Sequence, residues 1–126
     1  MSRVYEMRPS ERIVIDTATL DALFQRLGYR GAEARVMQAV EEISDSLVEV
    51  EARVRKGQMA GVVPQAQRVS RLSAEIGLTS LARVSRDMGI AAQRRDLVAF
   101  RAVWERLVRI GDRSLAQVWE VPELSL

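Results

Sequence analysis

The residues best suited to chemistry lie in one short stretch, Ala66–Gly77, which reads AQRVSRLSAEIG. It offers an amide at Gln67, hydroxyls at Ser70 and Ser73, and two guanidinium groups. A serine hydroxyl becomes a nucleophile only when a neighbouring base takes its proton, and nothing nearby is predicted to supply one. The chain has no histidine and no cysteine, which excludes a Ser-His-Asp triad, a cysteine nucleophile and a catalytic zinc site. We therefore predict a protein that is not an enzyme and carries no cofactor or metal.

The composition is that of one ordinary soluble domain. The chain has 126 residues, of which 48% are apolar and 29% charged. No glycine-rich phosphate loop or calcium-binding loop is present, and the acidic residues are scattered over helix surfaces. No apolar run approaches the roughly 20 residues that span a bilayer, and the first residues do not resemble a signal peptide. We expect a cytoplasmic protein without a membrane contact.

Apolar spacing predicts helices throughout. In the first, Asp16 is the N-cap, apolar residues recur at intervals of three and four, and Gly28 ends the helix. Its predicted stripe is Leu20, Leu23, Phe24 and Leu27. A long helix follows over 31–56, and its unbroken seam predicts packing against nearly parallel neighbours. That seam is Val36, Val40, Ile43, Leu47, Val50 and Val54.

Three further helices follow. Pro64 suits a helix that starts near Val62 or Val63, whereas a start at Met59 predicts a kink. Gly77 ends this helix, Thr79 is predicted to cap the next, and Asp96 the last. The predicted core residues of the three helices are Ala66, Val69, Leu72, Ser73 and Ile76; Leu81, Val84, Met88 and Ala91 or Ala92; and Phe100, Val103, Trp104, Leu107, Ile110 and Leu115.

The fold expected from these elements is all-α. Short links force consecutive helices to run antiparallel, so we predict an up-down four-helix bundle with a short extra N-terminal helix. The bundle occupies 13–119. Residues 1–12 are predicted to be a flexible N-terminal arm and 120–126 a C-terminal tail.

In the order of its helices and in the motif of 66–81, the chain resembles the histidine-containing phosphotransfer (HPt) domain family of two-component signalling, over about 13–119. The family motif has the form A-H-x-L-K-G-S-A-x-x-[LI]-G-A-x-x-L, and it is matched through Ile76, Gly77 and Leu81. The leading VIDTATLDAL is similar to the family's short first helix, and RDLVAF at 95–100 to the entry into its last helix. The resemblance implies a helical bundle that docks on receiver domains or histidine kinases.

The departures from the motif fall on the residues that carry phosphate. The acceptor histidine corresponds to Gln67, the phosphate-neutralising lysine to Ser70, and the small glycine that admits the partner to Arg71. An amide lacks the nucleophilic imidazole nitrogen, so the chain is expected to bind such a partner without accepting phosphate. Positions that pack or turn the chain are kept.

Helical spacing predicts that the family's docking surface survives as one exposed face. Its residues are Val63, Gln67, Ser70, Arg71 and Ala74. Nearby arginines would suit an acidic protein partner, although they would equally serve only to solvate the bundle. These arginines are Arg68, Arg71, Arg83 and Arg86.

Two other functions are compatible with the sequence. A helical-bundle interaction or assembly module unrelated to phosphorelays needs only the same amphipathic helices. Nucleic-acid binding is suggested by the pI of about 9.6, but a net charge of +2 and six aromatic residues, most of them predicted in the core, argue against it. The sequence leaves the oligomeric state open.

Overall fold

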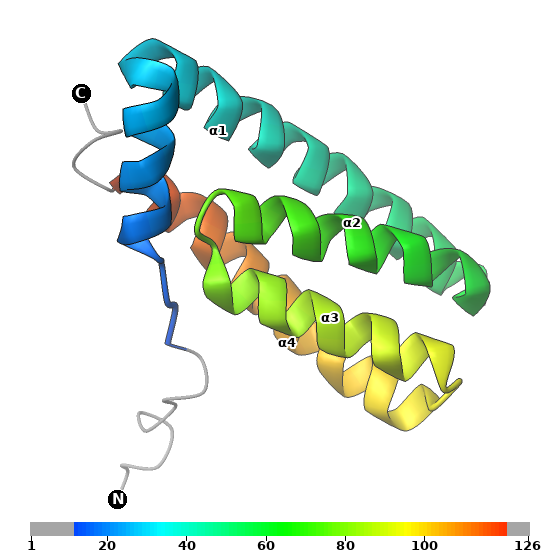
Figure 1. Cartoon of the computed structure of the whole chain (residues 1–126). Helices are drawn as coiled ribbons and strands as arrows, with labels where there is room; N and C mark the ends of the chain where they lie inside the picture. Colours follow the sequence, from blue (N-terminus) through cyan, green and yellow to red (C-terminus); the bar gives the residue numbers. More distant parts are fainter. Residues whose placement is uncertain (1–11, 121–126) are drawn as a thin grey trace, which may run out of the picture.

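The computed structural model describes residues 12–120 and shows four helices packed against one another (Figure 1). The protein is an all-α, antiparallel up-down bundle, as the sequence predicted. Of the predicted terminal segments, only Arg12 and Glu120 lie within the described residues. The elements are α1 (Thr17–Arg55), the 3₁₀ turn η2 (Met59–Gly61), α2 (Val62–Glu75), α3 (Thr79–Gln93), α4 (Leu97–Gln117) and the 3₁₀ turn η3 (Val118–Glu120).

Helix α1 consists of two arms that meet at Gly28. The backbone angles there are φ 75° and ψ 173°, which are not helical, and the helix continues on both sides. Figure 1 shows the short first arm set at an angle to the long second arm. Gly28 therefore ends the short helix as predicted, but no loop separates the two arms. Asp16 is the N-cap of the first arm, and its carboxylate accepts a hydrogen bond from the backbone N–H of Thr19 at 3.3 Å.

The segment before α1 is fastened to the turn between α2 and α3. The Asp16 N–H donates to the carbonyl oxygen of Gly77 at 2.7 Å, and Ile15 forms an antiparallel bridge with Leu78. The Val14 N–H donates to the Ser80 hydroxyl oxygen at 2.8 Å. Gly77 has a φ of 81°, which glycine adopts without the steric cost that other residues incur. These contacts join two parts of the chain that are separated in sequence by all of α1 and α2.

The predicted helix starts are confirmed for α2 and α4 and wrong for α3. Helix α2 begins at Val62, so Pro64 lies in the first turn and needs no kink. Asp96 caps α4 by accepting from the Ala99 N–H at 3.1 Å. Thr79, predicted as the cap of α3, is its first helical residue instead. The left-handed turn at Gly77 and the bridge to Ile15 place Leu78 in the cap position, where no side chain caps the helix.

The core consists of the predicted stripes, with a few residues displaced to the edge. Leu20, Leu23, Ile43 and Leu107 are at most 2% exposed, whereas Leu27, predicted in the first stripe, is 42% exposed. Leu27 directly precedes the break at Gly28, so the chain turns before this side chain can reach the core. The predicted core residues that are only half-buried against the core are Phe24, Val40, Leu47, Val54, Val103, Trp104 and Leu115.

The helices pack mainly against their neighbours in sequence. Backbones approach closely between α1 and α2, between α2 and α3, and between α3 and α4. Gly89 of α3 lies so near α2 that a β-carbon at that position would be 3.3 Å from the Ala66 side chain. The contact between α1 and α4 is looser and involves longer side chains such as Leu47. Within residues 12–120, none of the helices combines the length and apolar character required to span a membrane.

Candidate functional site

Helix α2 lies between α1 and α3, so it has one solvent-facing strip (Figure 1). Its inward face is buried and holds Val62, Ala66, Val69, Leu72 and Ser73. On the opposite face Gln67, Arg71 and Ala74 are exposed. We call these three residues the α2 strip. Gln67, which the sequence analysis aligned with the acceptor histidine of the HPt motif, is therefore exposed to solvent.

The α2 strip is narrower than the sequence predicted, because two of the five predicted residues lie at its edge. Ser70 is half-buried, and its hydroxyl donates to the carbonyl oxygen of Ala82 on α3 at 2.9 Å. Val63 is half-buried and packs against the core. On a helical wheel both residues lie on the same side of Gln67, which is the side that α3 covers.

The other edge of the strip is formed by an ion pair. The Arg68 guanidinium donates to the carboxylate of Glu42 on α1 at 3.0 Å. Arg68 is thus already paired within the bundle. Arg71, Arg83 and Arg86 are exposed and make no ion pair with any residue from 12 to 120. Of the four arginines predicted to suit an acidic partner, these three retain an unpaired positive charge.

The hydroxyls in this region are not placed to act as nucleophiles. Ser70 uses its hydroxyl to bind the backbone of α3, and Ser73 is fully buried. Across residues 12–120, no three acidic side chains are grouped so that they could hold a metal ion. The α2 strip can therefore present an amide and a positive charge to a partner, which are groups for binding rather than for covalent chemistry.

A second ionic contact, missed by the sequence analysis, fixes the C-terminal end of α2. The Arg35 guanidinium on α1 donates a hydrogen bond to each carboxylate oxygen of Glu75, with N···O distances of 2.6 and 2.5 Å. This hydrogen bonding lowers the pKa of Glu75 below its ordinary value of 4.5, and the charges of Arg26 and Arg71 act in the same direction. The partners are 40 residues apart, so no local pattern could have indicated the contact.

The Glu75 contact predicts a loss of stability in acid. Because the pKa of this carboxyl is lower in the folded chain than in the unfolded one, the contact stabilises the fold above pH 4.5 and is lost as the pH falls below it. Both side chains are partly exposed, so we expect a contribution of at most about 1 kcal/mol. Urea unfolding between pH 3 and 7 measures the effect. The free energy of unfolding of Glu75→Gln should fall less in acid than that of the wild type.

The reciprocal variant serves as the control for that measurement. Arg35→Gln removes the same contact from the other side, so it should flatten the same part of the pH profile. Equal acid sensitivity in the wild type and in both variants would contradict the assignment.

Comparison of the chain with protein-family models, curated proteins and solved structures found no match.

Proposed function

We propose that this protein is a non-catalytic, HPt-like signalling protein that binds a receiver domain or a histidine kinase without accepting phosphate. The observation that carries the proposal is the α2 strip: Gln67 stands exposed where the motif has its histidine, and Arg71 lies one turn further along. The unpaired Arg83 and Arg86 on α3 add positive charge beside it. A receiver domain presents an acidic pocket around its phosphoacceptor, which is the complementary charge.

The proposal excludes a relay function for this helix. An amide nitrogen does not accept a phosphoryl group as an imidazole nitrogen does, and the nearest hydroxyls are engaged or buried. Incubation with a phosphorylated receiver, or with a kinase and ATP, should leave the chain without acid-labile phosphate. Stable labelling of the wild-type chain would contradict a purely binding role.

The docking surface can be tested with one charge reversal. Arg71→Glu should weaken binding to an acidic receiver domain by about 1–3 kcal/mol, or roughly 5- to 150-fold, if this side chain is paired in the complex. Its effect on stability should stay within about 0.5 kcal/mol because the side chain is exposed. Affinities would be measured by biolayer interferometry against the receiver domains of the source organism.

A matched variant distinguishes this face from a general charge effect. Arg30→Glu makes the same change of charge at an exposed position on α1, outside the α2 strip. It should leave the affinity nearly unchanged. Equal weakening by both variants would indicate non-specific attraction, and binding that is insensitive to Arg71→Glu would place the partner on another surface.

A further inference from the structure

Two links between helices meet at the end of the bundle opposite the turn at Gly77 (Figure 1). One link is 56–61, between α1 and α2, and the other is 94–96, between α3 and α4. Residues of both links and the first residue of α4 line one hollow, and they are Gly57, Gln58, Met59, Ala60, Arg95 and Leu97. The two links therefore belong to a single surface. We call this surface, made of residues 56–61 and 94–98, the loop end.

Two large apolar side chains are exposed at the loop end. Leu97 and Val98 are the first two residues of α4, and they are 63% and 84% exposed. Both precede the buried Phe100, so the core of the bundle is formed without them. Single exposed apolar side chains are common on protein surfaces. An adjacent pair at the tip of a bundle is in addition placed to enter an apolar medium.

The loop end carries an excess of positive charge. Lys56, Arg94 and Arg95 are exposed and make no ion pair with any residue from 12 to 120. Two carboxylates lie close to them in the chain. Asp96 is engaged as the cap of α4, and Asp87 lies two turns before Arg94 on α3. Within 56–61 and 94–98 the cations therefore outnumber the carboxylates by three to one.

Arg95 has a backbone conformation in which glycine is normally found. Its φ is 56°, and its N–H donates to the carbonyl oxygen of Ala92 at 3.1 Å where α3 ends. The other positive φ values within residues 12–120 all belong to glycines, which are Gly28, Gly57 and Gly77. A side chain makes this conformation less favourable, so a glycine at position 95 would stabilise the fold. The arginine side chain thus lowers stability, which points to a role outside the fold.

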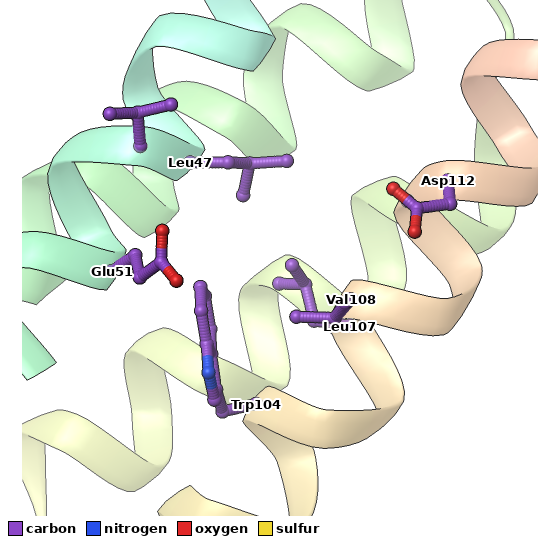
Figure 2. Close-up of a pocket in the computed structure, with 8 residues that line it drawn as sticks. Leu47, Glu51, Trp104, Leu107, Val108 and Asp112 are labelled. Carbon is purple, nitrogen blue, oxygen red and sulfur yellow. The ribbon is translucent and has the colours of Figure 1, made fainter.

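Two exposed valines on the side of the bundle differ from the loop end in the charges beside them. Val48 of α1 and Val108 of α4 line a groove between these two helices (Figure 2). The charged side chains that also line this groove are Glu51 and Asp112, and both are acidic. The residues that line the groove therefore offer no positive charge to an anionic partner, whereas the loop end combines exposed apolar side chains with cations.

We propose that the loop end docks on an anionic lipid surface. Leu97 and Val98 enter the interfacial layer of the bilayer, and Lys56, Arg94 and Arg95 bind lipid phosphates around them. The sequence led us to expect no membrane contact, because no segment is long and apolar enough to span a bilayer. Docking at the interface requires no spanning helix. The α2 strip lies on the side of the bundle and shares no residue with the loop end, so this contact is independent of the proposed function.

Co-sedimentation of the full chain with lipid vesicles tests the proposal. The wild type should bind vesicles of phosphatidylcholine and phosphatidylglycerol in equal parts, because these carry negative charge, and should not bind vesicles of phosphatidylcholine alone. Raising the salt concentration should weaken the binding. A wild type that binds neither kind of vesicle, or binds both equally, would overturn the proposal.

Substitution of Arg95 by glycine separates binding from stability. Arg95→Gly should lower the partition coefficient about fivefold, the equivalent of about 1 kcal/mol for one cation at an anionic surface. The same variant should unfold at a higher urea concentration than the wild type, because glycine tolerates the positive φ. Arg30→Gln removes a charge from an exposed position on α1 outside the loop end, and it should leave the partition coefficient nearly unchanged. Equal binding of the wild type and Arg95→Gly would contradict the proposal.

A second pair of variants tests the insertion of apolar side chains. Val98→Gln should weaken binding to the anionic vesicles at least about fivefold, because a polar amide replaces methyl groups that leave water on docking. Val48→Gln is the matched control, since Val48 is 65% exposed and lines the groove between α1 and α4. Circular dichroism would verify that both variants keep the helical fold. Binding that depends on Arg95 but not on Val98 would show that the loop end recognises a soluble polyanion, and would refute docking on lipid.

Discussion

Replacing Gly77 with alanine is expected to destabilise the fold by about 3 kcal/mol or more. Two costs add at this position. The φ of 81° is unfavourable for any residue with a side chain, and a β-carbon would lie 2.7 Å from the carbonyl oxygen of Asp16. That oxygen belongs to the backbone, and the N–H of the same residue donates a hydrogen bond to Gly77, so it cannot rotate away as a side chain would. The measurement is the free energy of unfolding in urea.

Gly57 supplies a matched control for this prediction. Its φ of 71° is nearly the same, but a β-carbon there would meet nothing within 4 Å. Gly57→Ala should therefore cost only the left-handed conformation, about 1–2 kcal/mol. If the two variants were equally destabilised, the segment before α1 would be free to move away from the turn at Gly77, and the contacts between this segment and the turn would contribute little to stability.

Leu107→Ala is expected to lower the free energy of unfolding by about 2–5 kcal/mol. The side chain of Leu107 is fully buried in the middle of α4, so its removal leaves a cavity within the core. Leu47→Ala should lower the free energy of unfolding by less than half as much. Leu47 is only half-buried and lines a groove between α1 and α4. The measurement is the free energy of unfolding of both variants in urea. Equal losses of stability in the two variants would mean that Leu47 is fully buried between α1 and α4 in solution.

The sequence predicted most reliably the features that depend on neighbouring residues alone. The caps at Asp16 and Asp96 and the helix ends at Gly28 and Gly77 follow from local hydrogen bonding and backbone geometry, and the structure confirms all four. The buried stripes follow from helical periodicity in the same way. These features together determine the order of the helices and the short links that make the bundle antiparallel.

Features that depend on the choice of neighbour could not be predicted. Periodicity shows which side of α2 is apolar, but not that α3 reaches far enough around it to engage Ser70. The ion pair of Arg35 with Glu75 joins residues that are 40 positions apart in the sequence. The exposure of Val48 could be expected, since this residue falls outside the regular seam of its helix. A single valine outside the seam does not, however, indicate a groove between α1 and α4.

The packing of each helix on its neighbour in the chain has a consequence for how the protein folds. Most native contacts connect nearby parts of the sequence, so little loop-closure entropy opposes the formation of successive helical hairpins. Helical bundles of such low contact order fold in roughly microseconds to milliseconds. The hydrogen bond from the Asp16 N–H to the Gly77 carbonyl oxygen is of longer range, because it closes a loop that contains all of α1 and α2. Its closure costs less entropy once those helices have formed, so we expect this hydrogen bond to form late in folding.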